Sequence, residues 1–130
     1  MKVFDLDTAR ELIPVIKPIV EEISSLRSEL VDSIQRIDEE SDQLELMYLQ
    51  SHIKDIDHQI KLLFKRIESL GGVIKGIDPI LVDFLSTFQN RYIWLCWKED
   101  EDTIMFWHEL NEGFAGRKPV SLLLQEEPRL

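Results

Sequence analysis

The stretch DQLELMYLQSHIKDIDHQIKLLFKRIESLGG, residues 42–72, decides the fold class. Its apolar residues recur at alternating steps of three and four, at Leu46, Leu49, Ile53, Ile56, Ile60, Leu63, Ile67 and Leu70. This heptad spacing places the eight side chains on one stripe of a helix and is typical of a coiled coil. Asp42 and Glu45 form a capping box ahead of the helix. Gly71 and Gly72 end it, because glycine accepts the left-handed conformation of a C-cap.

A similar stripe of apolar residues lies ahead of this stretch. Its members follow one another at steps of three or four and are Leu12, Ile16, Ile19, Ile23, Leu26, Leu30, Ile34 and Ile37. Pro14 and Pro18 lie inside it but off the stripe, and each lacks the N–H that a helix interior uses. We therefore expect a kink near the prolines, or a main helix that begins at one of them. Only DEESD, residues 38–42, separates the two stripes, so the helices must be antiparallel neighbours.

After Gly72 the apolar residues follow the period of strands rather than helices. We expect strands at 73–77, 81–88, 91–97 and 103–108, with turns at Asp78–Pro79 and Gln89–Asn90. At the start of the chain we expect an edge strand at 2–4, followed by an N-cap of the first helix at Asp5, Asp7 or Thr8. At the other end, residues 120–124 are expected to form a last strand or a docking tail. The predicted fold is α+β: a long antiparallel helical hairpin (1–70) followed by a small antiparallel β-meander of three to four strands. Residues 71–124 hold the meander and the loop GFAGR (residues 113–117), and residues 125–130 form a tail. The whole chain is expected to be a single domain.

The turns set the register of the meander. If Gln89–Asn90 is a two-residue turn, Asp83 faces Cys96. If the charged loop KEDED, residues 98–102, pairs Trp97 with Thr103, His108 faces Tyr92. The register also assigns the residues of each strand to one of the two faces of the sheet.

One face is nearly all apolar, includes Met105 and Trp107, and should pack on the helices. The other mixes Asp83, Cys96 and His108 with large apolar groups, so we expect a second subunit or the C-terminal segment to cover it. In this register Cys96 and His108 lie several residues apart on adjacent strands. We therefore interpret Cys96 as a small buried apolar residue and not as a nucleophile with a neighbouring base.

Composition limits the classes of function. The chain has 130 residues, is 44% hydrophobic and carries a net charge of −10, which disfavours nucleic acid and anionic membrane surfaces. No run of about 18 apolar residues suggests a membrane span, and the start of the chain does not resemble a signal peptide. One cysteine cannot form an internal disulfide, so a cytoplasmic location is the simplest interpretation.

The stretch TIMFWHELNEGFAGR, residues 103–117, holds the residues that packing explains least. His108 and Glu109 are metal-ligand types, but neighbours on a strand point to opposite faces. The chain has no H-E-x-x-H or C-x-x-C motif, and helix surfaces often carry pairs such as Asp55 and His58 by chance. We therefore predict no metal and no cofactor.

The loop GFAGR, residues 113–117, allows two interpretations. Gly113 and Gly116 could form a backbone nest in which Arg117 binds a phosphate or carboxylate. Alternatively, the glycines permit a tight turn and Arg117 pairs with one of the many acidic groups.

Several segments together resemble one bacterial family. They are LIP at 12–14, LVDF at 81–84, LCW at 95–97, WHE at 107–109 and GFAGR at 113–117. Their order and spacing are similar to those of the family DUF2203, a domain of unknown function. The resemblance implies a small soluble bacterial protein and adds no mechanism.

The leading hypothesis is a non-enzymatic protein that self-associates, as a homodimer, through the helical hairpin or the mixed sheet face. The alternative is an anion- or metal-dependent enzyme, or a protein that binds an unknown small molecule, with its site in the WHE and GFAGR segments. The candidate ligand-binding residues are Asp83, Trp107, His108, Glu109, Gly113, Gly116 and Arg117.

Overall fold

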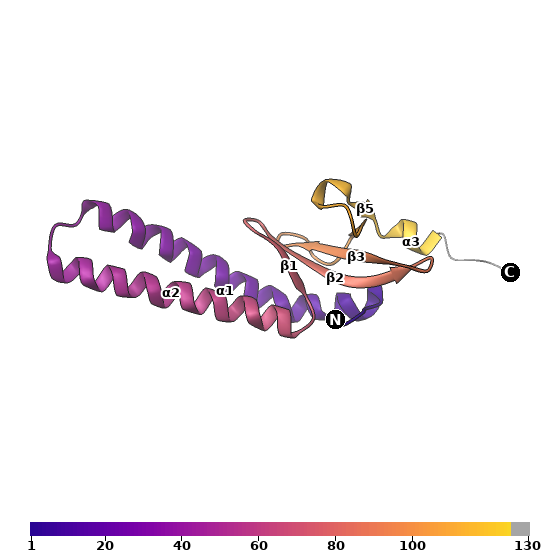
Figure 1. Ribbon diagram of the computed structural model, residues 1–130, viewed down its shortest axis with the longest axis horizontal. Coiled ribbons are helices and arrows are strands. Elements are labelled where there is room, and N and C mark those ends of the chain that lie inside the picture. Colours follow the sequence, from indigo (N-terminus) through magenta and orange to yellow (C-terminus); the bar gives the residue numbers. More distant parts are fainter. Residues whose placement is uncertain (126–130) are drawn as a thin grey trace. The chain divides into compact units, whose positions relative to one another are not determined.

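The computed structural model describes residues 1–125, which form two long helices followed by an antiparallel sheet and a short last helix (Figure 1). The elements are α1 (Leu6–Glu39), α2 (Gln43–Ser69), β1 (Val73–Ile77), β2 (Ile80–Phe88), β3 (Arg91–Lys98), β4 (Phe106–Glu109), the 3-10 helix η1 (Phe114–Gly116), β5 (Lys118–Pro119) and α3 (Ser121–Gln125). The predicted α+β order of hairpin and then sheet is confirmed. Residues 126–130 of the expected tail lie outside the described residues.

The chain divides into two compact units. One is the part of the helical hairpin from Pro18 to Arg66. The other joins Met1–Lys17 to the residues from Ile67 onward and contains the whole sheet.

Within the unit Pro18–Arg66, the predicted stripes are buried or half-buried with one exception. Ile34 is 48% exposed, whereas Ser33 is buried. Two successive steps of four residues rotate a side chain about 80° past the stripe at about 100° per residue, which carries Ile34 out of the contact. A hydrogen bond between Glu29 and His52 and an ion pair between Arg36 and Glu45 join the helices, as antiparallel neighbours require.

The helix ends confirm the capping signals in part. Asp5 is the N-cap of α1, because its Oδ1 accepts the Thr8 N–H at 2.7 Å. The helix then runs unbroken through Pro14 and Pro18, so the alternative of a main helix that begins at a proline is wrong. Asp42 caps α2 by accepting the Leu44 N–H at 3.3 Å.

Gly71 ends α2 for two reasons. Its φ is +107°, in the left-handed region that side chains avoid. In addition, a Cβ at this position would lie 2.5 Å from the ring of Phe4. Phe4 is itself buried against the sheet, with its ring edge-on to Phe84 and its N–H donated to the carbonyl of Leu85. The residues before α1 therefore make one backbone hydrogen bond to the sheet and not the expected edge strand.

The five strands pair in chain order, β1-β2-β3-β4-β5, and all pairs are antiparallel. The count exceeds the predicted three to four because Lys118–Pro119 adds a two-residue strand. The segment expected as a last strand at 120–124 instead belongs largely to α3.

The register of the β2–β3 hairpin is as predicted, with Asp83 opposite Cys96. Gln89 and Asn90 both have positive φ, as a two-residue hairpin turn requires. The next register was wrong by two residues: His108 lies opposite Trp94 and not Tyr92. The cause is that β4 begins at Phe106 and not at Thr103.

A shift of two residues leaves each side chain on its predicted face. The apolar face is buried at Val82, Phe84, Ile93, Leu95, Trp97 and Trp107. Met105 precedes β4 and is 41% exposed, so its predicted place in the core is wrong.

Candidate functional site

The mixed face of the sheet contains a cavity of about 330 Å³. Its lining comes from β1 to β4 and from the loop after β4, and consists of Lys75, Leu81, Asp83, Cys96, His108, Glu112, Gly113 and Phe114. The chain after β4 therefore covers part of this face. The sequence led us to expect that either a second subunit or the C-terminal segment would cover it.

Three buried side chains from adjacent strands meet in the cavity. Asp83 on β2 lies opposite Cys96 on β3, and His108 comes from β4. One carboxylate oxygen, the thiol sulfur and one ring nitrogen lie within 4.8 Å of one another. All three residues are at most 3% exposed. The sheet thus brings together an acid, a thiol and an imidazole on rigid strands.

The hydrogen bonds of His108 fix its protonation. Its Nδ1 lies 2.9 Å from the main-chain oxygen of Glu109, and a carbonyl oxygen only accepts, so Nδ1 carries a hydrogen. Its Nε2 lies 2.9 Å from Oδ2 of Asp83. A contact of that length between two acceptors requires a proton, which His108 and Asp83 therefore share.

Burial dominates the electrostatics of the cluster. It raises the pKa of Asp83, against the opposing effects of the His108 charge, of hydrogen bonds from Cys96 and His108, and of the Lys75 charge. Burial first, and the adjacent Asp83 charge second, raise the pKa of Cys96 to about 12. Cys96 is therefore a neutral thiol at pH 7. Within residues 1–125, Oδ1 of Asp83 is buried and has no hydrogen-bond partner.

Lys75 brings a positive charge to the cavity. The pairs Ile74–Val82 and Gly76–Leu81 leave Lys75 as the extra residue of a β-bulge. Its ammonium lies 4.3 Å from the ring centroid of Trp94. Lys75 makes no salt bridge with any described residue.

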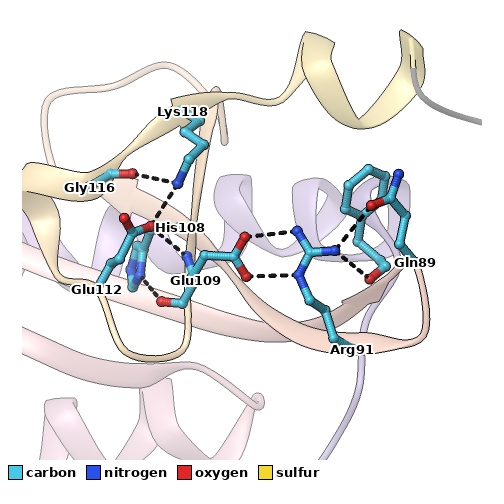
Figure 2. A network of polar contacts seen from close by, with 8 residues as sticks. Gln89, Arg91, His108, Glu109, Glu112, Gly116 and Lys118 are labelled. Carbon is cyan, nitrogen blue, oxygen red and sulfur yellow. Dashed lines mark hydrogen bonds and ion pairs between the residues drawn. The ribbon is translucent and has the colours of Figure 1, made fainter.

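Trp107 and Glu109 flank His108 in β4 and project to the opposite side of the sheet. Glu109 receives two hydrogen bonds from Arg91, which hold the pKa of its carboxyl below the usual value (Figure 2). Trp107 is buried, and its ring lies 4.9 Å from the ammonium of Lys118. Neither Trp107 nor Glu109 lines the cavity.

Glu112 holds the loop in place beside the cavity. Its Oε1 accepts the Glu109 N–H at 3.1 Å and the Lys118 ammonium at 2.7 Å (Figure 2). These bonds lower the pKa of the Glu112 carboxyl, the Lys118 bond most. Gly116 is needed here because a Cβ would lie 2.7 Å from Cβ of Glu112, whereas a Cβ on Gly113 would meet no atom of the described residues within 4 Å.

Arg117 makes contacts that fit the ion-pair interpretation of the GFAGR loop. It donates to Glu101 and to the main-chain oxygen of Cys96. Its guanidinium lies 4.2 Å from the ring centroid of Phe106 and 4.7 Å from that of Phe114. Both side chains of the Glu101–Arg117 pair are 10% exposed. Arg117 is therefore held in the structure and does not line the cavity.

The structure thus brings together Asp83, His108 and Gly113 from the predicted set. It adds Cys96, which sequence reasoning separated from His108 because of the two-residue error in register. Part of the signal was available, since Asp83 was correctly placed opposite Cys96. A signal for the bulge at Lys75 was also present, because the adjacent Gly76 is a glycine inside the predicted strand 73–77.

Among the described residues, Asp83, Cys96 and His108 are a group of metal-ligand types close enough to hold one ion. The expectation of no metal relied on the absence of local motifs, which detect ligands close in sequence. Here the ligand types are 25 residues apart from first to last. Asp55 and His58 are exposed on α2 and lie outside this group.

The fold and the site define a small α+β protein with a buried acid, thiol and imidazole beside a cavity. The chain belongs to the family of uncharacterized conserved proteins DUF2203, whose model matches residues 2–120. No curated protein and no solved structure matches it. Among the described helices, none combines the length and the apolarity that a membrane crossing requires.

Proposed function

We propose that this protein is cytoplasmic and that it binds a small anionic molecule in the cavity on the mixed face. The observation that carries the proposal is the ammonium of Lys75, which lines the cavity without a salt bridge to any described residue. An unpaired positive charge in a concave site favours a negatively charged ligand.

The other titratable groups of the cavity are also consistent with a negatively charged ligand. Asp83 and His108 share a proton, so that pair is neutral in sum, and Cys96 is a thiol. Glu112 is matched by its bond to Lys118. Lys75 therefore leaves the cavity with a net positive charge.

The size and the apolar lining indicate a small molecule. A volume of about 330 Å³ is near the lower end of the range for ligand pockets, roughly 300 to 1,000 Å³. Leu81 and Phe114 offer apolar surface to the part of the ligand that carries no charge. A monocarboxylate with a short apolar body fits this combination.

Nuclear magnetic resonance titration of the full chain with acetate, and separately with inorganic phosphate, tests the proposal. We expect saturable shifts of the backbone amides of Lys75 and Gly113, which Lys75→Gln abolishes. Lys65→Gln, a change of an exposed lysine on α2, is the matched control and should leave the shifts intact. Equal shifts in the wild type and in Lys75→Gln, or no shifts with either anion, would contradict the proposal.

A separate observation favours self-association as a second function. Near the connection between α1 and α2, five large apolar side chains are between 48% and 75% exposed: Val31, Ile34, Leu44, Met47 and Tyr48. Exposed apolar groups that gather in one region commonly mark interaction sites. We name these five residues the tip patch and propose that it joins two copies of the chain.

Sedimentation velocity tests the second function. Met47→Lys should convert a dimer to a monomer, because a buried lysine charge without a partner opposes association. Leu62→Lys is the control, since Leu62 is a similarly exposed apolar residue of α2 outside the tip patch. A wild type that is monomeric at high concentration would end this proposal and leave the cavity proposal unaffected.

A further inference from the structure

We propose that Asp83, Cys96 and His108 form a binding site for one Zn²⁺ ion at the floor of the cavity. The three ligand atoms lie within 4.8 Å of one another, and each side chain is buried on a strand of the same sheet. The proposal does not depend on the anionic ligand, because none of the three residues is Lys75.

The chemistry of the donors selects the metal. A thiolate, an imidazole and a carboxylate are the three ligand types of zinc sites, and a soft sulfur disfavours Mg²⁺ and Ca²⁺. Three protein ligands leave a fourth position for water or another molecule, as in zinc sites that act on ligands. Here the cavity adjoins the three residues and can supply that molecule.

His108 is already oriented as a ligand. Its Nδ1–H donates to the main-chain oxygen of Glu109, which leaves Nε2 directed toward Asp83. Metal-binding histidines almost always donate their second ring N–H in this way, because the bond fixes the tautomer and the ring orientation.

Asp83 supplies an independent observation. Its residue is 1% exposed and its Oδ1 has no hydrogen-bond partner within residues 1–125. A buried carboxylate oxygen without a partner is costly, and coordination of a cation removes that cost.

The replacement of protons by Zn²⁺ at the three residues is balanced in charge. Zn²⁺ displaces two protons, one from the Cys96 thiol and one that Asp83 and His108 share. The carboxylate and the thiolate then neutralise the two charges of the ion. The charge of Lys75 at the cavity is unchanged, so metal and anion can bind together.

Cobalt titration of the full chain, after its treatment with a chelator, tests the site, because Co²⁺ reports its ligands by absorption. We expect one Co²⁺ per chain, a thiolate-to-metal charge-transfer band, and displacement by Zn²⁺. Cys96 is the only cysteine, so the band identifies it without any variant. Cys96→Ser should abolish the band. His108→Gln and Asp83→Asn should raise the dissociation constant beyond the roughly 10- to 100-fold that loss of an outer partner costs.

The matched controls are Asp55→Asn and His58→Gln, which remove the same chemical groups from the exposed surface of α2. Both should leave the band and the affinity unchanged. Absence of the charge-transfer band in the wild type would overturn the proposal, even if some Co²⁺ binds. Loss of binding in the α2 variants, with affinity retained in His108→Gln, would assign the metal to the helix instead. Failure of acetate and phosphate to bind would leave these results untouched.

Discussion

Two buried pairs of an acidic and a basic side chain lie in the same compact unit, and they differ in what surrounds them. Glu101–Arg117 joins the loop before β4 to the loop after it, and Arg117 also lies against the rings of Phe106 and Phe114. Asp83–His108 joins β2 to β4 beside a cavity. Each pair leaves one polar atom without a hydrogen-bond partner among residues 1–125, Nε of Arg117 and Oδ1 of Asp83.

The difference separates a structural pair from a candidate site. Nε of Arg117 is buried and belongs to a residue that lies near two rings and outside the cavity lining, so a ligand in the cavity does not reach it. Asp83 lines the cavity, where a ligand can reach it. The ionisation chemistry differs as well, because arginine keeps its proton in proteins whereas histidine can release it. Removal of Glu101 should therefore leave a buried, unpaired charge on Arg117, whereas removal of the Asp83 carboxylate should leave no charge on His108.

The largest effect should follow from Glu101→Ala. The change leaves the guanidinium of Arg117 nearly buried and without its carboxylate, and loss of one partner of a buried pair costs about 3 kcal/mol or more. Denaturant unfolding measures this loss. Glu109→Ala breaks the more exposed pair with Arg91 and should cost less than about 1 kcal/mol, so equal losses would contradict the distinction.

An intermediate effect should follow from Gly116→Ala, which acts on the loop that carries Arg117 and lines the cavity. The new methyl would meet Cβ of Glu112 at 2.7 Å, and forced overpacking costs about 1 to 3 kcal/mol. Gly113→Ala is the control, because its methyl would meet no atom within 4 Å in the part of the chain that the structure describes. Thermal unfolding measures the loss of stability of both variants. An equal loss in Gly116→Ala and Gly113→Ala would show that Gly116 is not closely packed.

The smallest effect on stability should follow from Asp83→Asn. The new side chain can donate a hydrogen bond to Nε2 of a neutral His108, so we expect a loss of about 1 kcal/mol or less at pH 7. A loss as large as that of Glu101→Ala would show that both pairs are structural.

The same variant has a pH dependence of known sign. Burial raises the pKa of Asp83, so the folded protein retains a proton that the unfolded chain releases above 3.8. The stability from this source is present at low pH and is lost as pH rises through the raised pKa. Asp83→Asn should therefore gain stability relative to the wild type as pH rises from about 4 toward neutrality. Unfolding at a series of pH values measures the trend, and a change in the opposite direction would contradict the raised pKa.

The comparison also shows how far the sequence could predict the molecule. The heptad stripe of α2 and the glycine at 71 were sufficient for the hairpin, because burial of one stripe and a left-handed cap are local requirements. The stutter at Ile34 was visible in the spacing, but the burial of Ser33 in its place was not.

The loop KEDED explains the error in the sheet. The Glu101 carboxylate accepts a hydrogen bond from the Lys98 N–H, and the main-chain oxygen of Glu101 accepts one from the Nε1–H of Trp97, so the loop is longer and more ordered than a simple reversal. Arg117, 16 residues further along the chain, completes that arrangement. Contacts of this kind depend on tertiary structure, and the two-residue shift that they produce is what brings His108 close to Cys96.

The central claim is that the buried acid, thiol and imidazole form a binding site and are not only part of the core. Anomalous X-ray diffraction at the zinc absorption edge, from crystals of the full chain grown with Zn²⁺, tests it most directly. The account predicts one peak per chain bounded by Asp83, Cys96 and His108, with a fourth ligand on the cavity side. A peak only at surface positions such as Asp55 and His58, or intact Asp83–His108 contacts with no peak between the three residues, would contradict it.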